Sequence, residues 1–309
     1  MDLLLFPLMT VLAAAQQPPA PPPSNPHPTV VSTYVPERVY DTGRNTFSDL
    51  EAMLADLARA DVVLVGEQHD DPNTHRLESA VLMGLLRRKV AITLSLEMFE
   101  RDVQSVVDDY LAGRLTEEKF LEQSRAWPRY ETDYRPLVEA SKAHGWKVVA
   151  ANVPRRLASA VAKAGLSALD ELHEGERAHI ARAIECPLDN YFERFEQTMD
   201  GHPGDDKLTP EERRARTERY YYSQCLKDET MAESIVSAFA RREGSRGTIV
   251  HFNGAFHSDF GAGAAERVRR RLPGRRVAVV SILPVEDIDA ITPEGEELKR
   301  AEYLVYTVK

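Results

Sequence analysis

Six short apolar runs recur along the chain, and longer amphipathic stretches separate them. The runs are rich in valine, isoleucine and leucine and occupy residues 62–65, 90–96, 147–151, 248–252, 277–283 and 303–308. Continuous apolar runs of this length are typical of strands that are buried on both faces of a sheet. The pattern therefore predicts about six buried strands.

The stretches between the runs carry the signals of helices. Asp71 and Pro72 supply an N-cap and a first-turn proline, and leucine and valine side chains repeat behind them at helical spacing. Residues 134–144 precede the third run, and the long stretch 210–242 precedes the fourth. Strands that alternate with helices form parallel sheets with right-handed crossovers. We therefore expect an α/β fold, with a mostly parallel central sheet flanked by helices.

One polar segment, residues 172–222, fits this alternation poorly and lies between the third and fourth predicted strands. A turn is expected at 202–206, and Thr209, Pro210 and Glu212 form a capping-box pattern with proline at the first helical position. We predict a helical insertion over about 172–222. The sequence leaves two roles open for it, a lid over a binding site and a solvated helical hairpin.

The first 28 residues do not have the pattern of a folded domain. Residues 3–15 are apolar and end in small side chains, which predicts a signal peptide over 1–15, although no lysine or arginine precedes the run. Residues 16–28 are rich in proline and are expected to form a linker without a packed core. No cysteine follows the apolar run. We therefore expect an exported protein without a lipid anchor there, and a single domain over 29–309.

The charge of the chain narrows the function classes. Its 39 lysines and arginines against 49 aspartates and glutamates give a formal net charge of -10. A nucleic-acid-binding surface is expected to be basic, so we do not expect a nucleic-acid-binding protein. The two cysteines, Cys186 and Cys225, are too few for a disulfide-built fold and too far apart in the chain for a cysteine zinc site. They flank the insertion and would staple it in an oxidising compartment, but the sequence leaves their pairing open.

Acidic, basic, amide and imidazole side chains follow four of the predicted strands at the point where each strand ends. The carboxyl ends of parallel strands meet at one edge of the sheet, where ligands bind. We therefore expect a functional crevice lined by these residues, which are Glu67, His69, Glu97, Asn152, Arg155, Asn253 and His257.

Two of these strand ends share the pattern Gly-x-x-His, at Gly66 to His69 and at Gly254 to His257. A glycine after the strand allows a sharp turn that presents the histidine to the crevice. Together with Glu67 and Glu97, the two imidazoles have the chemistry either to bind a divalent metal with an open position for water or to hold a general base. Glu67, His69, Glu97 and His257 are thus the candidate catalytic and metal-binding residues.

The ordered motifs of the chain resemble those of the ChaN-like haem-binding family, over about residues 61–283. That family shares a superfamily with the Tiki metalloproteases and the erythromycin-esterase-like hydrolases. The motifs are Gly66-Glu67-x-His69, residues 96–101 with Gln104, Trp127 with Tyr134-Arg135-Pro136, residues 151–155, Gln224 with residues 228–232, and Asn253-Gly254-x-x-His257.

The resemblance implies a haem-binding protein of iron uptake that is exported and periplasmic or associated with the outer membrane. It is compatible with a homodimer that holds haem between its subunits, and with peripheral membrane association without a lipid anchor. The hydrolase branches imply the alternative, a metal-dependent peptidase or esterase that uses Glu67, His69, Glu97 and His257.

Haem binding requires an axial ligand, and histidine, tyrosine and methionine are the usual choices. The inserted helices offer Tyr191, Met199, His202, Tyr220, Tyr221 and Tyr222. Three consecutive tyrosines on a helix point in different directions, so at most two of the last three can face one site. We give Tyr191, Met199, His202 and Tyr221 as candidate ligands, and Asn152, Arg155 and Asn253 as further cofactor-binding residues.

Two other features call for structural explanations. Trp127 is expected to pack in the core because a buried indole contributes a large apolar area. The arginines at 267, 269, 270 and 271 are expected to form a solvated helix end.

Overall fold

The computed structural model describes residues 37–309, except 89–90, 202–206 and 242–246. The predicted signal peptide and proline-rich linker lie outside the described residues, as does the predicted turn with His202. Among the described helices, none combines the length and the apolar character that a membrane span requires.

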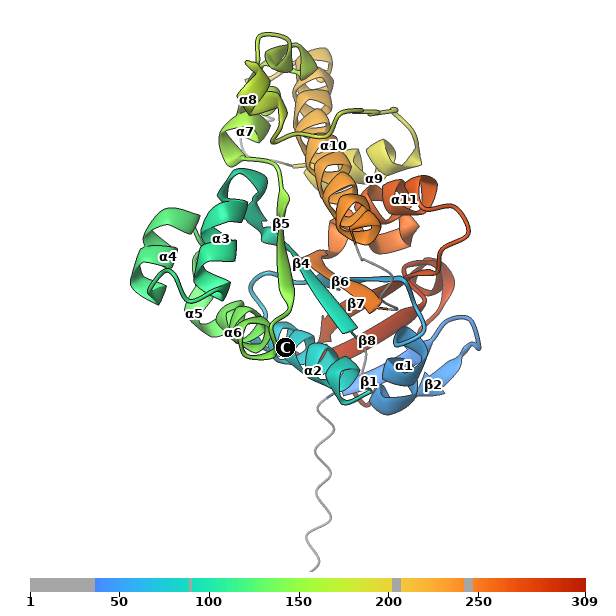
Figure 1. Ribbon diagram of the computed structural model, residues 1–309. Helices are drawn as coiled ribbons and strands as arrows, with labels where there is room; N and C mark the ends of the chain where they lie inside the picture. The colour runs from blue at the N-terminus through green and yellow to red at the C-terminus, as the bar shows by residue number, and fades with distance from the viewer. Residues whose placement is uncertain (1–36, 89–90, 202–206, 242–246) are drawn as a thin grey trace, which may run out of the picture. The chain divides into compact units, whose positions relative to one another are not determined.

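The described domain is built on an eight-stranded sheet (Figure 1) in the order β2-β1-β8-β7-β3-β6-β4-β5. The strands are β1 Glu37–Asp41, β2 Thr46–Ser48, β3 Val62–Glu67, β4 Ala91–Glu100, β5 Lys147–Asn152, β6 Gly247–Gly254, β7 Val277–Val285 and β8 Tyr303–Val308. Strands β3 to β8 are mutually parallel. They are the six predicted strands, so the mostly parallel α/β fold is confirmed.

The two strands that sequence reasoning missed, β1 and β2, form an antiparallel extension beside β8. They are only five and three residues long, with the sequences ERVYD and TFS. Neither carries an apolar run: β2 is the edge strand and has no buried residue, and the three buried residues of β1 include Asp41.

Helices fill the connections, as the alternation predicted. They are α1 Leu50–Leu57, α2 Pro72–Arg87, α3 Gln104–Leu111, α4 Glu117–Ser124, α5 Tyr130–Asp133, α6 Arg135–His144, α7 Arg155–Ala164, α8 Glu174–Arg177, α9 Asn190–Met199, α10 Pro210–Ala240 and α11 Gly263–Arg271. The predicted N-cap of α2 is confirmed, since the Asp71 carboxylate accepts hydrogen bonds from the Asn73 and Thr74 amides.

Helices cover both faces of the sheet. On one face Leu54 of α1 and Val81 of α2 pack against the strands. On the other face Met231 and Ile235 of α10 and Val268 of α11 do so. Every β3 residue is consequently buried, which is why its run is continuously apolar until Glu67.

The insertion between β5 and β6 contains α8, α9 and the first half of α10. Thr209 and Glu212 form the predicted capping box at the start of α10. The helix then continues for 31 residues to Ala240. The predicted insertion therefore does not end at Tyr222. Its second helix and the helix that leads to β6 are one continuous helix, α10.

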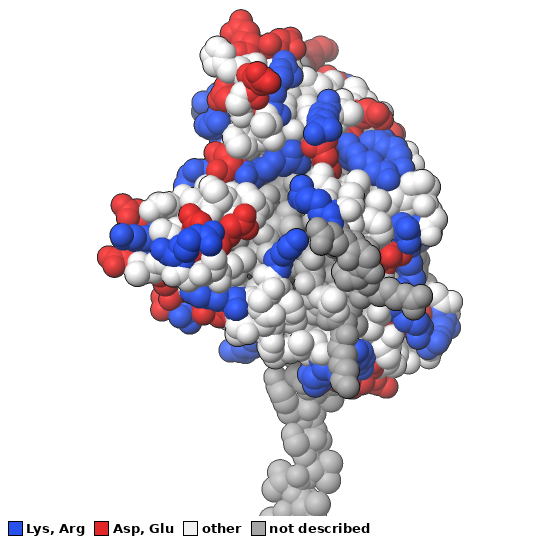
Figure 2. All heavy atoms as spheres, in the orientation of Figure 1, with Lys and Arg blue, Asp and Glu red and all other residues white. Residues whose placement is uncertain are grey.

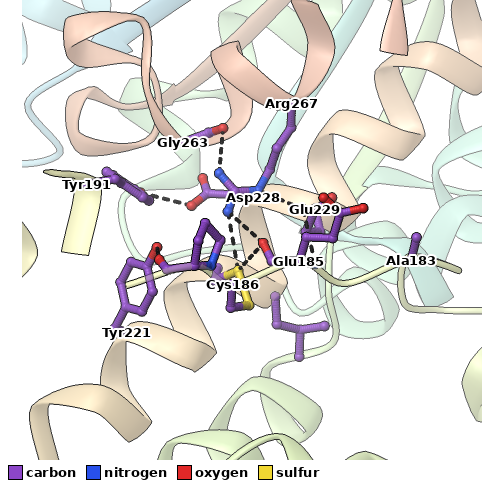
Figure 3. Close-up of a disulfide and its surroundings, with 12 residues drawn as sticks. Ala183, Glu185, Cys186, Tyr191, Tyr221, Asp228, Glu229, Gly263 and Arg267 are labelled. Carbon is purple, nitrogen blue, oxygen red and sulfur yellow. Dashed lines mark hydrogen bonds and ion pairs between the residues drawn. A yellow bond between two sulfur atoms is a disulfide. The ribbon is translucent and has the colours of Figure 1, made fainter. Parts of the chain in front are cut away.

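A disulfide joins Cys186, in the loop before α9, to Cys225 of α10, with Cα atoms 5.8 Å apart (Figure 3). The bond closes a loop across 39 residues of sequence. It answers the pairing question that the sequence left open, and it fixes the segment that leads into α9 against α10.

The arginines of α11 do not form the solvated helix end that we expected. Arg267 is only 4% exposed and lies between the disulfide and Glu229 (Figure 3). Its Nε is 3.0 Å from Oε1 of the fully buried Glu229, to which Arg270 and Arg271 also bind. A buried carboxylate requires compensating charge, and these arginines supply it. Elsewhere, charges of both signs are interspersed over the face that Figure 2 shows.

Candidate functional site

A cavity of about 780 Å³ lies at the carboxyl ends of β3, β4 and β6. Its lining includes Glu67, His69, Glu97 and His257, which come from three strand ends that are far apart in the sequence. The parallel pairing explains the meeting, because Gly66 lies beside Asn253 and Glu67 beside Gly254.

Glu67 and His69 form the first acid–imidazole pair. Nδ1 of His69 lies 2.5 Å from Oε1 of Glu67, and the Tyr134 hydroxyl donates to the same oxygen at 2.9 Å. The His69 side chain is 44% exposed, whereas that of Glu67 is fully buried. Burial works to lower the pKa of His69, but the hydrogen bond to Glu67 and the charge of Glu97 raise it above its ordinary value. Nε2 remains the ring nitrogen outside this pair.

His257 forms the second pair, and carboxylates hold both of its nitrogens. Nδ1 lies 2.7 Å from Oδ1 of Asp228 in α10, and Nε2 lies 3.3 Å from Oε1 of Glu97. Burial opposes protonation, but the charges of Glu97 and Asp228 outweigh it and raise the pKa of His257 to about 9. Although burial works to raise the pKa of Glu97, the charge of His257 holds it well below its usual range. At neutral pH His257 is a buried imidazolium.

The glycines of the two Gly-x-x-His segments provide space for this packing. A Cβ on Gly254 would lie 2.7 Å from Nε2 of His69, and one on Gly66 would lie 2.9 Å from the Cα of Ala255. Both distances are too short for a side chain. Neither glycine has a positive φ, so close approach, and not the sharp turn we expected, is what requires glycine here.

The four residues predicted as metal ligands do not converge as one donor set. Carboxylates already engage both nitrogens of His257, Asp228 at Nδ1 and Glu97 at Nε2. Within the described part of the chain, one group of three residues has acidic or imidazole donor atoms that all lie within 4.8 Å of one another. These residues are Glu67, His75 and Glu78. All three residues are buried, and burial and the neighbouring Glu67 raise the pKa of Glu78 well above its ordinary value.

The predicted asparagines brace the strand ends and do not line the cavity. The Asn152 side chain accepts from the amide of Val153, and the Asn253 side chain donates to the Gly254 carbonyl and the Ser258 hydroxyl. Arg155, by contrast, lines the cavity from the start of α7.

The predicted haem ligands on the insertion occupy different places. Tyr191 lines the cavity, and its hydroxyl donates to Oδ2 of Asp228 at 2.8 Å. Tyr221 is fully buried beside it, and its hydroxyl donates to the Pro187 carbonyl, so it is a core residue and is not positioned as a ligand. Met199 lies near the start of α10 in a separate cavity. His202 lies outside the described residues.

Sequence reasoning missed several residues of the site. Trp127 packs against the core, as we expected, but it is also partly exposed, lines the cavity and meets the His69 ring edge-on at 5.2 Å. Asp228 and Gln224 both contact His257. The family motifs include both residues, but we did not assign them to the site; their separation by four residues in a predicted helix, which places them on one face, was the available signal.

The fold and the cavity define an α/β protein with a pocket at the carboxyl edge of a mostly parallel sheet. The matching family is described as haem-binding uptake, Tiki superfamily, ChaN, and it matches residues 53–268. The chain belongs to this family.

Two known proteins illustrate the likeness. The structure described as "Cofacial heme binding to ChaN of Campylobacter jejuni" has a TM-score of 0.65 and 17% identity, over 88% of this chain and 97% of that chain; it shares the fold. Protein RETICULATA-RELATED 5, chloroplastic, of Arabidopsis thaliana is 25% identical over 265 residues, which are 81% of this chain and 34% of that protein. The chain spans about a third of this relative's length.

Proposed function

We propose that this protein binds haem in the cavity at the carboxyl edge of its sheet and takes part in haem uptake as an exported protein. Membership of the haem-binding ChaN family supports the choice of ligand. The observation that carries the proposal is His69, a partly exposed imidazole in an aromatic-walled cavity whose Nδ1 is already fixed by Glu67.

The chemistry of the cavity fits an iron porphyrin. Trp127, Phe256 and Phe260 supply aromatic walls, and Phe256 stacks on Tyr191 with ring centroids 5.1 Å apart. Histidines that ligate metals characteristically hydrogen-bond a carboxylate through their other nitrogen, as His69 does with Glu67. We assign the iron to Nε2 of His69.

Tyr191 is a poorer ligand than His69. Burial and the charge of Asp228 raise the pKa of Tyr191 well above its ordinary value. A tyrosinate ligand would have to lose its proton and give up the hydrogen bond to Asp228. In this chain Tyr191 instead positions Asp228, which holds His257.

The metal-dependent hydrolase is not favoured. Its four residues form two acid–imidazole pairs, Glu67 with His69 and Glu97 with His257, and within the described residues their donor atoms do not gather as one set. The family match also points to the haem-binding branch.

Export is supported by the disulfide between Cys186 and Cys225, because disulfides persist in oxidising compartments. The proposal includes a periplasmic or outer-membrane-associated location, a homodimer and peripheral membrane association without a lipid anchor. Cell fractionation and size-exclusion chromatography with and without haem test these parts.

Titration of the purified protein with haemin tests the ligand. A shifted Soret band that saturates at a defined stoichiometry is expected. Unshifted spectra, or a linear increase without saturation, would refute haem binding.

A further inference from the structure

We propose that Arg155 and Lys227 form an anion subsite in the cavity that binds the carboxylates of the ligand, which are the two propionates of haem. This inference rests on the proposed function and extends it, because it states how the cavity distinguishes an acidic porphyrin from a neutral one.

Arg155 occupies an unusual position in its helix. It is the first residue of α7, whose amino terminus has no side-chain cap and no acidic residue in its first turn. The helix dipole disfavours cations at this end and favours anions. Two arginines stand there, Arg155 and Arg156, and only Arg156 has an acidic partner, Glu176.

Within the described residues, Arg155 has no ion pair or hydrogen bond through its side chain, and it faces the cavity lining. The acids on its other side, Glu100 and Asp102, are bound by Arg125. An anion in the cavity would bind the guanidinium and also favour the α7 amino terminus.

Lys227 presents the second cation. It lies on α10, lines the same cavity, and has neither an ion pair nor a side-chain hydrogen bond among the described residues. The two other cationic residues of the lining are already paired, Arg300 with Asp259 at 2.6 Å and Arg194 with Glu296 at 3.7 Å. Of these four cations, Arg155 and Lys227 have no salt bridge within the described residues, and the charge of Lys227 also helps to lower the pKa of the nearby Glu97.

The arrangement matches the charge distribution of haem. The imidazole of His69 and the acidic pairs lie at the strand ends, whereas Arg155 and Lys227 come from helices α7 and α10 beside them. The lining of this one cavity therefore offers a complement both for a metal centre and for peripheral carboxylates.

A comparison of haemin with haemin dimethyl ester, whose propionates carry no charge, tests the subsite. Dissociation constants are measured by Soret titration in one detergent buffer, for the wild type and for R155Q, K227Q and the double variant. The wild type should bind haemin more tightly than the ester. Each single variant should weaken haemin binding by about tenfold, the usual effect of losing a charged hydrogen bond. The double variant should bind the two ligands alike.

R156Q is the matched control, because Arg156 adjoins Arg155 in α7 but pairs with Glu176; it should bind haemin like the wild type. Equal binding of haemin and ester by the wild type, with R155Q and K227Q indistinguishable from R156Q, would overturn the subsite while haem binding stands. Failure of the wild type to bind either ligand would overturn both proposals. A loss seen equally for haemin and ester in R155Q would indicate a structural role and would also contradict the subsite.

Discussion

Nδ1 of His257 lies 2.7 Å from Oδ1 of Asp228, and this contact joins the turn after β6 to the middle of α10. It divides the two histidines of the cavity by role. His257 is enclosed by carboxylates and holds the insertion helix against the sheet, whereas His69 is bound by Glu67 through Nδ1 and its side chain is partly exposed. The same short motif therefore produces one structural imidazolium and one candidate ligand.

Replacing His257 with glutamine should destabilise the protein by about 3–5 kcal/mol at neutral pH, because Glu97 and Asp228 would be left buried without their counter-charge. Chemical denaturation measures the change in the free energy of unfolding. His144→Gln, on the partly exposed end of α6, is the control and should cost little. An unaltered stability of H257Q would contradict the buried imidazolium.

The pH dependence of stability should report the same group. Because folding raises the pKa of His257 from 6.5 to about 9, its contribution is complete below pH 6.5 and is lost as the pH rises through 9. The stability difference between the wild type and H257Q should therefore shrink between pH 7 and pH 10, as followed by thermal or urea unfolding. A constant difference over that range would show that His257 is neutral in the folded protein.

Gly254→Ala should displace His69 without unfolding the protein. The added methyl group would lie 2.7 Å from Nε2 of His69, and the partly exposed imidazole can rotate away. We expect an altered Soret band and weakened haem binding, with secondary structure by circular dichroism unchanged. Gly175→Ala, where a Cβ meets no atom within 4 Å, should leave both unchanged.

Glu229→Gln should cost about 3–5 kcal/mol, because three arginines lose a buried carboxylate. Glu185→Gln is the matched comparison: the Glu185 side chain is 63% exposed and pairs with Arg270 alone, so it should cost about 1 kcal/mol or less. Equal effects of the two substitutions would contradict the central place of Glu229 in the arginine cluster.

Serine at both Cys186 and Cys225 should lower the stability by about 2–4 kcal/mol, the usual effect of a disulfide that closes a long loop. Hydrogen exchange should accelerate in the segment before α9, since the bond fixes that segment to α10. Unchanged exchange there would mean that Arg267 and the neighbouring contacts hold the segment without the disulfide.

Local patterns predicted the parallel part of the sheet because β3 to β8 are buried on both faces and leave continuous apolar runs. They did not reveal β1 and β2, whose sequences are short and carry no apolar run. The meeting of Glu67, His69, Glu97 and His257 in one cavity followed from a topological rule and agrees with the structure's geometry. The different roles of the two histidines could not be predicted in this way. They depend on Asp228, which comes from a helix more than a hundred residues beyond Glu67.

Burial was equally hidden from composition. From the sequence we expected the arginines of α11 to form a solvated helix end. In the structure Arg267 pairs with the buried Glu229, and no spacing in the sequence relates these two segments. The place of Trp127 in the cavity lining was hidden for the same reason, since exposure to a cavity is a tertiary property.

The central claim is that haem iron is held by His69, with its imidazole positioned by Glu67. Haemin titration of the wild type, His69→Ala and Tyr191→Phe tests it most directly, with free imidazole added to the alanine variant. We predict that H69A loses the shifted Soret band, that imidazole restores it, and that Y191F keeps it. An unchanged Soret band in H69A together with its loss in Y191F would contradict the account.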